Sequence, residues 1–210
     1  HILLGRAAKH DSQHGRAWRA LTTAMQLYAA RGSMVDAARA AVETLNIFIA
    51  PGPRQEIADR ALAALGDQDP QLEAMLIIQR LRLRSLDSER ERALEARLAV
   101  LRAAHSFPDV EANVAGYAID RALFAGQSEQ AIRLSRQAHR LYIAADDAEQ
   151  AAAVLYGEAI AIGHVGRLDE AVRTLHALRE FSSRAQLRLF EGLAYQGLAG
   201  ILYNRGQIAQ

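Results

Sequence analysis

A short segment near the start of the sequence carries side chains that could bind a metal ion. His10 and His14 lie four residues apart with Asp11 between them, so a helix through this segment would place two imidazoles one turn apart, near a carboxylate. The segment also reads as a polar loop leading into the first clear helix. No third ligand follows at a suitable spacing, so we expect the loop, no metal site and no cofactor.

A second stretch is rich in arginine and could bind phosphate groups. Acidic residues alternate with its later arginines, as on a solvated helix face with ion pairs four residues apart, and no aromatic residue lies among them. We expect a solvated face, and we keep a nucleic-acid- or phosphate-binding helical repeat as the alternative function. The arginines are Arg80, Arg82, Arg84, Arg90, Arg92 and Arg97.

No residue pattern of an enzyme accompanies these clusters. The sequence lacks the phosphate-binding glycine loop, the His-Glu-x-x-His zinc motif and the Gly-x-Ser-x-Gly nucleophile motif. His164 and His176 are expected on the two helices of one pair, and His164 suits the negative end of a helix dipole. We therefore predict that the chain is not an enzyme and that these histidines have structural roles.

Composition restricts the fold and the compartment. Half of the 210 residues are apolar and only 6% are aromatic, which favours closely packed Ala- and Leu-rich helices over a sheet. The absence of cysteine excludes disulfides and is compatible with the cytoplasm, where we expect the chain. The 25 basic and 24 acidic residues are interspersed, and no apolar run approaches the roughly 18–20 residues of a membrane span, so we expect neither nucleic acid nor a membrane as partner.

Glycines at a fixed spacing indicate a repeated helix pair. Gly126, Gly166 and Gly206 recur every 40 residues, because 166 − 126 and 206 − 166 are both 40. An apolar helical stripe precedes Gly166 and another follows at once, so two helices must fold back antiparallel around it. Glycine suits the left-handed residue that ends a helix, and Gly32 is expected to play the same part.

The expected architecture is an all-α superhelical array of antiparallel helix pairs, with about eleven helices and no strand. Residues 1–50 would form N-terminal helix pairs, 51–69 a proline-rich break with a short helix, and 70–210 a repeat array continuous with the first part. The helices we expect most clearly span 12–31, 35–48, 57–65, 129–144, 147–164, 168–181 and 183–204, with others starting near 70, 88 and 108.

Four segments predict how helices begin. Asp69 is expected to cap a helix that starts at Pro70, and Ser88-Glu89-Arg90-Glu91 reads as a capping box. The stretches Asp147–Gln150 and Ser183–Gln186 are expected to cap two further helices.

The ends suggest a piece of a larger protein. The chain opens on His1 without an initiator Met and stops four residues after Gly206. We expect the helix that would cover the apolar face of residues 187–202 to be missing, and this exposed terminal repeat could pair two copies as a homodimer.

The sequence between the helices resembles the tetratricopeptide repeat. Gly-Arg-Leu-Asp-Glu-Ala at 166–171 lies between small residues at Ala159 and Ala171, with large ones at Leu155 and Ile162. The period of 40 in place of 34, and the linker-like Leu-Gly-Asp-Gln-Asp-Pro, resemble the degenerate C-terminal arrays of large bacterial ATP-dependent transcription activators of the maltose-activator type. The resemblance implies a sensor or scaffold region of a bacterial signalling or transcription regulator.

It also implies a concave groove, lined by the first helix of each pair, that binds a protein segment or a small effector. An ordinary solvated surface is the alternative for the same residues. The groove positions carried over from the family are Arg19, Thr22, Gln26, Asn113, Asp120, Tyr156, His164, Gln196 and Asn204.

Overall fold

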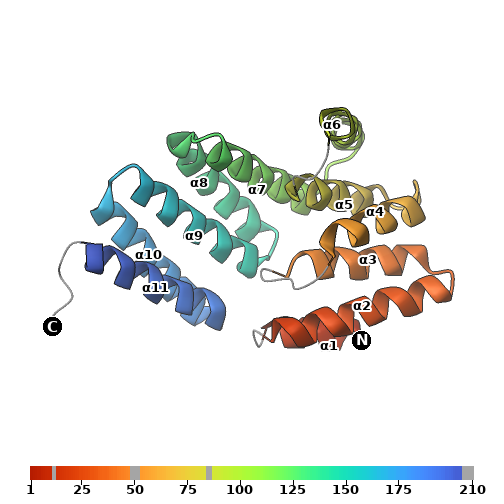
Figure 1. The fold of residues 1–210 in the computed structure, drawn as a ribbon, viewed down its shortest axis with the longest axis horizontal. Coiled ribbons are helices and arrows are strands. Elements are labelled where there is room, and N and C mark those ends of the chain that lie inside the picture. The colour runs from red at the N-terminus through yellow and green to blue at the C-terminus, as the bar shows by residue number, and fades with distance from the viewer. Residues whose placement is uncertain (11–12, 48–52, 84–86, 205–210) are drawn as a thin grey trace. The chain divides into compact units, whose positions relative to one another are not determined.

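The computed structural model describes residues 1–10, 13–47, 53–83 and 87–204, without the side chains of residues 9, 10 and 204. Within these ranges the chain forms eleven α-helices and no strand, which confirms the all-α prediction (Figure 1). The helices are α1 (Ile2–His10), α2 (His14–Ala30), α3 (Met34–Leu45), α4 (Arg54–Leu65), α5 (Pro70–Arg82), α6 (Ser88–Ala104), α7 (Pro108–Phe124), α8 (Ser128–Ala144), α9 (Ala148–His164), α10 (Leu168–Arg184) and α11 (Arg188–Asn204).

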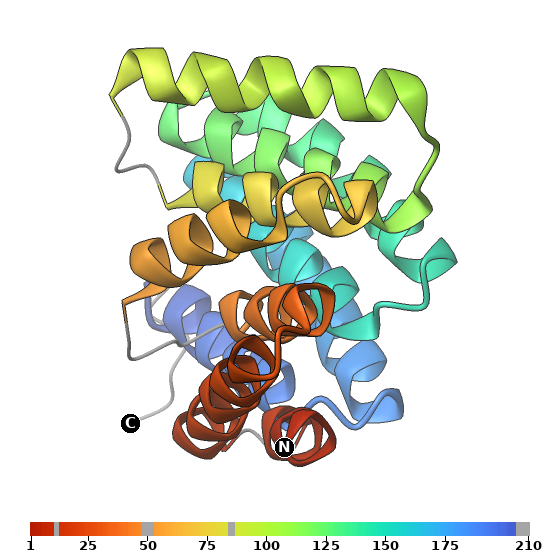
Figure 2. The ribbon, with the colours of Figure 1, turned by 90° about the vertical axis from the view of Figure 1, so that its right-hand side faces the viewer.

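The chain divides into two compact units, residues 1–110 and 111–210, and the boundary falls inside α7. In unit 1 each helix from α1 to α6 packs against the next, and α3 also contacts α5. The helix α6 lies at the edge of this unit as one straight element beside α5 (Figure 2). Most of the proline-rich break predicted from residues 50–53 lies outside the described residues, which resume at Pro53.

The helices of unit 2 recur every 20 residues, which is half of the 40-residue spacing of the glycines. The helices α7 to α11 each have 17 residues and begin at residues 108, 128, 148, 168 and 188, so each starts 20 residues after the one before. Neighbours in sequence are neighbours in space: α8 packs on α9, α9 on α10 and α10 on α11, and α11 also touches α9. The 40-residue period expected from glycine is therefore two helices long.

In unit 2, the helices α7 to α10 are each followed by a three-residue link, and all four links have the same turn geometry. The middle residue has a positive φ, at Gly126 (71°), Asp146 (56°), Gly166 (79°) and Gln186 (56°). The next residue donates its N–H to the carbonyl five positions back, as in Arg167 N–H to Ile162 O at 3.2 Å, which satisfies a carbonyl that the helix end leaves free. Gly32 (φ 75°) closes α2 in the same way, confirming the predicted turns, whereas Gly206 lies outside the described residues.

Two predicted helix starts are wrong. Ser88 is not the cap of α6: the Asp87 carboxylate accepts from the N–H groups of Glu89 (3.1 Å) and Arg90 (2.8 Å), because Asp is already in the extended conformation that an N-cap needs. The predicted break at residues 181–183 is also wrong, since α10 continues to Arg184 and turns at Gln186. The sequence reading did not identify α1, a short helix packed on α2.

The other two caps are confirmed. Asp69 accepts from Leu72 N–H at 3.0 Å, with Pro70 as the first helical residue of α5. Asp147 accepts from Gln150 N–H at 3.0 Å and starts α9.

Small residues bring the helices of unit 2 close together. Ala159 (3% exposed) shares a buried cluster with Leu175, Leu178 and Phe190. Ala171 belongs to a second cluster, which also holds Ala161 and Ile162. Both alanines are buried but belong to different clusters: Ala159 shares its cluster with Leu175 of α10, which lies one turn after Ala171.

Candidate binding site

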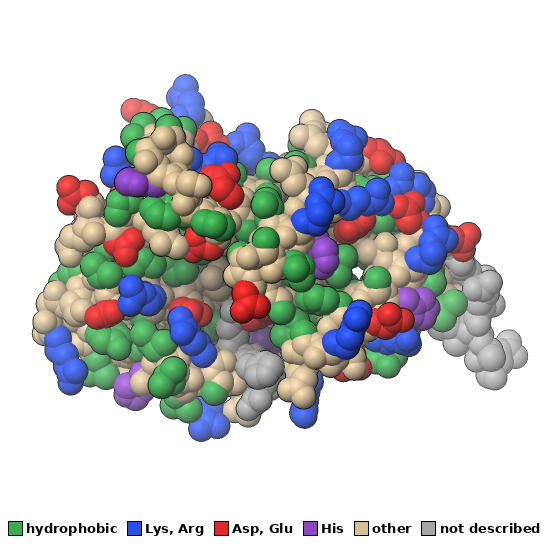
Figure 3. Space-filling model, turned by 180° about the vertical axis from the view of Figure 1, so that it is seen from behind, with side chains coloured by type: hydrophobic (Ala, Val, Ile, Leu, Met, Phe, Trp, Pro, Cys, Tyr) green, Lys and Arg blue, Asp and Glu red, His purple; other side chains and the backbone are tan. Residues whose placement is uncertain are grey.

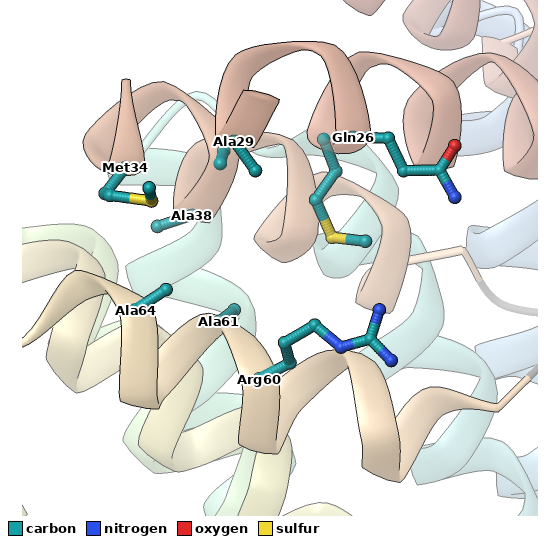
Figure 4. A pocket seen from close by; sticks show the side chains of 9 residues that line it. Gln26, Ala29, Met34, Ala38, Arg60, Ala61 and Ala64 are labelled. Carbon is teal, nitrogen blue, oxygen red and sulfur yellow. The ribbon is translucent and has the colours of Figure 1, made fainter. Parts of the chain in front are cut away.

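A small apolar pocket lies among α2, α3 and α4 in unit 1 (Figure 4). The walls come from α2 and α4, and α3 provides the floor through Ala37 and Ala38, which are both buried. The lining residues are Met25, Gln26, Ala29, Met34, Ala37, Ala38, Arg60, Ala61 and Ala64.

The pocket exists because alanine occupies the helix positions that face it. A methyl group is too short to span the gap between α2 and α4, and the two methionine side chains, being unbranched and flexible, fill it only in part. Its volume is about 80 Å³. This is roughly half of the ~150 Å³ cavity that can hold benzene and far below the ~300–1,000 Å³ of sites for drug-sized ligands. One aliphatic side chain fits; a small-molecule effector does not.

Polar groups stand at one end of the pocket only. Gln26 from α2 and Arg60 from α4 lie toward the same end, while Met34, Ala29 and Ala64 are at the other (Figure 4). Arg60 pairs with Glu56 one turn earlier on α4, and both side chains are well exposed. The mouth is therefore neutral overall and offers an amide and a compensated guanidinium for hydrogen bonding.

Three of the predicted groove residues lie on α2, on the helix that forms one pocket wall. Gln26 lines the pocket and is exposed. Arg19, about two turns before Gln26 in the same helix, is exposed. Thr22 is half-buried, and its hydroxyl donates to Trp18 O at 2.8 Å. Of these three, only Gln26 takes part in the pocket.

The other predicted groove residues belong to unit 2 and do not gather in one place. Asn113 on α7 is buried (3% exposed) and accepts from the Tyr142 hydroxyl at 3.5 Å, so it contributes to the interior. Asp120 on α7 and Tyr156 on α9 are half-buried, the latter against the cluster of Leu175. His164 on α9 and Gln196 on α11 are exposed, and the side chain of Asn204 lies outside the described part.

Three of the six arginines in the arginine-rich stretch pair with carboxylates. Arg80 is buried and its Nε donates to Asp59 at 2.7 Å, and Arg90 reaches the same carboxylate at 3.0 Å. Arg97 forms two hydrogen bonds of 2.7 Å to Glu73, which raise the pKa of its guanidinium. Figure 3 shows acidic and basic side chains next to one another over one face of the molecule. These pairs compensate the charge of Arg80, Arg90 and Arg97, whereas Arg92 donates to the Ser88 carbonyl at 2.9 Å and Arg84 lies outside the described residues.

Arg54, whose guanidinium feels the charge of Arg82 in the arginine-rich stretch, is fixed by a hydrogen bond to the backbone. Its guanidinium donates to the carbonyl of Leu45 at the end of α3. Burial lowers the pKa of Arg54, and the positive charge of Arg82 lowers it further. Arg54 thus joins the start of α4 to the end of α3, two of the three helices that form the pocket.

The two histidines near the start, which a single helix would place one turn apart, lie on different helices. His10 is the last residue of α1 and His14 the first of α2, so they are not one turn apart in one helix, and Asp11 lies outside the described residues. In the part of the chain that is described, no three His, Asp or Glu side chains gather as metal ligands. His164 and His176 are exposed on α9 and α10.

An ion-pair chain links three helices of unit 2. Arg136 on α8 donates to Glu158 on α9 (2.8 Å) and to Glu170 on α10 (2.7 Å), and these hydrogen bonds raise the pKa of Arg136. Arg167 joins Glu170 (3.0 Å) to Glu129 (3.2 Å). The side chain of Glu158 is only 8% exposed, so this network fixes how α8, α9 and α10 pack.

The sequence reading missed every pocket residue except Gln26. Alanine is frequent in the segments that form α2, α3 and α4, and this frequency is the signal that the sequence offers. A sequence pattern does not show whether neighbouring side chains fill the space that alanine leaves.

Comparison of the chain with protein-family models and with curated proteins finds no match. None of the helices in the described ranges has both the length and the apolar character needed to cross a membrane.

Proposed function

We propose that the chain is a non-enzymatic helical-repeat binding module that holds a protein segment by one aliphatic side chain, inserted between α2 and α4. The pocket carries this proposal: it is apolar, open to solvent, and sized for a single side chain. A neutral mouth with Gln26 and Arg60 favours a segment whose residues next to the anchor are uncharged and present backbone groups for hydrogen bonding.

The arrangement of the helices supports a tetratricopeptide-like α-solenoid. Packing between sequence neighbours throughout the described helices, and the fixed helix length and shared turn of unit 2, are typical of such arrays. In them the first helices of successive pairs line a concave face, which is where α2 and α4 would lie. We extend the proposal to a cytoplasmic sensor or scaffold region of a bacterial signalling or transcription regulator, on the strength of the resemblance of the 40-residue period and the turn sequence.

Matched substitutions on α4 test the binding site. Ala64 lines the pocket and is exposed, so Ala64→Leu would fill the pocket from its rim without crowding the core. Ala63 is its exposed neighbour and does not line the pocket, so Ala63→Leu is the control. Short peptides selected from a displayed random library on the full chain should carry an aliphatic anchor. Their affinity should fall roughly tenfold or more, about 1.4 kcal/mol, with Ala64→Leu and stay unchanged with Ala63→Leu.

The three methionines of the chain give an independent readout. Met25 and Met34 line the pocket, whereas Met75 is buried in α5 away from it. In methyl NMR spectra, a selected peptide should shift the Met25 and Met34 signals and leave Met75 in place. Peptides that bind Ala64→Leu as tightly as the parent chain, without shifting these two methyl groups, would refute the proposed site.

A further inference from the structure

Two of the three methionines of the chain line the pocket of unit 1. Met25 and Met34 are half-buried, whereas Met75 is only 8% exposed on α5. The chain has no cysteine, so the methionine thioethers are its only sulfur groups. Oxidisable sulfur is therefore concentrated in the pocket to which the binding proposal assigns a function.

An oxidant as small as hydrogen peroxide can reach these two thioethers. The pocket is open to solvent, and its volume of about 80 Å³ exceeds the roughly 30 Å³ that a water molecule occupies in the liquid. Hydrogen peroxide has only one oxygen atom more than water, so it fits among the lining side chains. Met75 offers no such route, because it is buried and does not line the pocket.

The reaction adds one oxygen atom to each sulfur. A lone pair of the thioether sulfur attacks one peroxide oxygen, the O–O bond breaks, and the other oxygen leaves as hydroxide, which takes up the remaining proton and becomes water. Sulfur is oxidised and peroxide is reduced by the same electron pair. The product, a sulfoxide, is polar and chiral where the methionine was flexible and apolar, and methionine sulfoxide reductases reverse the change.

A sulfoxide at Met34 would lie at the apolar end of the pocket. Of the lining side chains, only Gln26 and Arg60 carry hydrogen-bond donors, and both lie toward the other end, away from Met34 (Figure 4). An aliphatic anchor that enters the pocket would displace the water around the sulfoxide oxygen and leave this oxygen without a donor. A buried acceptor that loses its water in this way opposes binding.

We propose that Met25 and Met34 form a modification site, at which oxidation by peroxide prevents the pocket from binding an aliphatic anchor. The effect on binding rests on the proposed function of the pocket, but the order in which the methionines react does not. The reduced pocket accepts the anchor, and the oxidised pocket rejects it until a sulfoxide reductase restores the thioethers. The binding module thereby responds to an oxidant.

Mass spectrometry of the full chain after graded exposure to hydrogen peroxide tests the site without any ligand. A buried thioether reacts only when its helix opens locally, so Met25 and Met34 should each gain one oxygen roughly tenfold faster than Met75, or more. Similar rates at all three methionines would overturn the assignment of the site.

Peptide binding tests the consequence, with a selected aliphatic-anchored peptide that itself contains no methionine or cysteine. Oxidation of the parent chain should weaken binding roughly tenfold or more, about 1.4 kcal/mol, and a methionine sulfoxide reductase should restore it. A chain with both Met25→Leu and Met34→Leu keeps an apolar pocket that cannot be oxidised, so its binding should not respond to peroxide. Met75→Leu is the matched control, and its binding should remain sensitive to peroxide.

The outcomes separate this inference from the binding proposal. Equal affinities of the reduced and oxidised parent chains would overturn the inference and leave the binding proposal in place. A reduced chain that binds no such peptide would refute the binding proposal and the effect of oxidation on it, whereas the oxidation rates would still identify the reactive methionines. Circular dichroism of the oxidised chain should be unchanged; a loss of helix would assign the weaker binding to unfolding and contradict a local effect in the pocket.

Discussion

Leu175 of α10 packs directly over the backbone of Gly197 in α11. A Cβ added at Gly197 would lie 2.9 Å from Leu175 Cδ2 and 3.0 Å from Cδ1. Leu175 is 3% exposed and belongs to a buried cluster, so its methyl groups would move away from the added Cβ among other buried side chains. Gly197 therefore sets how closely the two helices approach, and α11 requires glycine here in spite of the helix propensity that glycine loses.

We expect Gly197→Ala to destabilise unit 2 by about 1–3 kcal/mol, the usual range for an overpacked core. Gly157→Ala on α9 is the matched control, since its added Cβ would meet nothing within 4 Å. That variant should gain about 0.5–1 kcal/mol from helix propensity. Urea unfolding measures both, and equal free energies of unfolding for the two variants would show that Leu175 moves aside freely.

The turns of unit 2 predict a reciprocal pair of substitutions. Gly166 and Gln186 occupy equivalent positions with φ of 79° and 56°. A side chain in this left-handed region costs roughly 1–2 kcal/mol, so Gly166→Gln should destabilise by about 1 kcal/mol or more and Gln186→Gly should stabilise by about 0.5–1 kcal/mol. Thermal unfolding of both variants checks the opposite signs; a loss of stability with Gln186→Gly would show that the glutamine side chain does more than tolerate the turn.

These turns also show how far the sequence predicts the fold. Glycine marks the left-handed residue at positions 32, 126 and 166, and there the prediction is right. At Asp146 and Gln186 the same geometry is held by residues with a Cβ, so no glycine signals the turn. The chain was therefore expected to break at Ser183, where serine resembles a cap, although the packing of α10 carries the helix on to Arg184.

The candidate site was less predictable than the fold because it depends on unfilled space. Position on the first helix of a pair pointed to Gln26, which does line the pocket. The same reasoning placed Asn113 in a groove, whereas its side chain is buried. A repeat pattern shows which face of a helix a residue occupies, but how far the next helix covers that face depends on side-chain volumes on both helices.

Asp87 predicts a response of α6 to acid. Hydrogen bonds from the backbone N–H groups of Arg90 and Glu89 lower the pKa of this carboxyl from its ordinary value of 3.8. A lowered folded-state pKa means that the charged cap stabilises the helix fully above 3.8, and that this contribution is lost as the pH falls below 3.8 and through the folded-state value. The protection of the Glu89 and Arg90 amides against hydrogen exchange, measured relative to their intrinsic exchange at each pH, should fall in that window. With Asp87→Asn, a cap without a titrating group, this fall should be absent; the same fall in both proteins would assign it to another group.

The ion pair between Arg136 and Glu158 predicts that an exposed residue contributes measurably to stability. Glu158 is nearly buried, so removing Arg136 would leave a carboxylate without its closest counter-charge. Because half of the Arg136 side chain is exposed and solvent screens part of the interaction, we expect Arg136→Ala to cost about 1–3 kcal/mol, less than for a fully buried pair. The raised pKa of Arg136 keeps its guanidinium charged well into the alkaline range, and a raised folded-state pKa means that the contribution is lost only at still higher pH, so the cost should not change between neutral and mildly alkaline pH.

The equivalent position in α11 indicates which substitutions should restore the stability lost with Arg136→Ala. Leu198 occupies in α11 the position that Glu158 has in α9, 40 residues earlier, and it is buried in the same type of cluster. Glu158→Leu combined with Arg136→Met should therefore recover most of the stability lost by Arg136→Ala, because an apolar pair replaces a desolvated charge. A double-mutant cycle by urea unfolding isolates the coupling. If Arg136→Ala costs no more than Arg167→Ala, whose acidic partners are both more exposed than Glu158, then Glu158 is stabilised by the backbone and packing around it and not by the guanidinium.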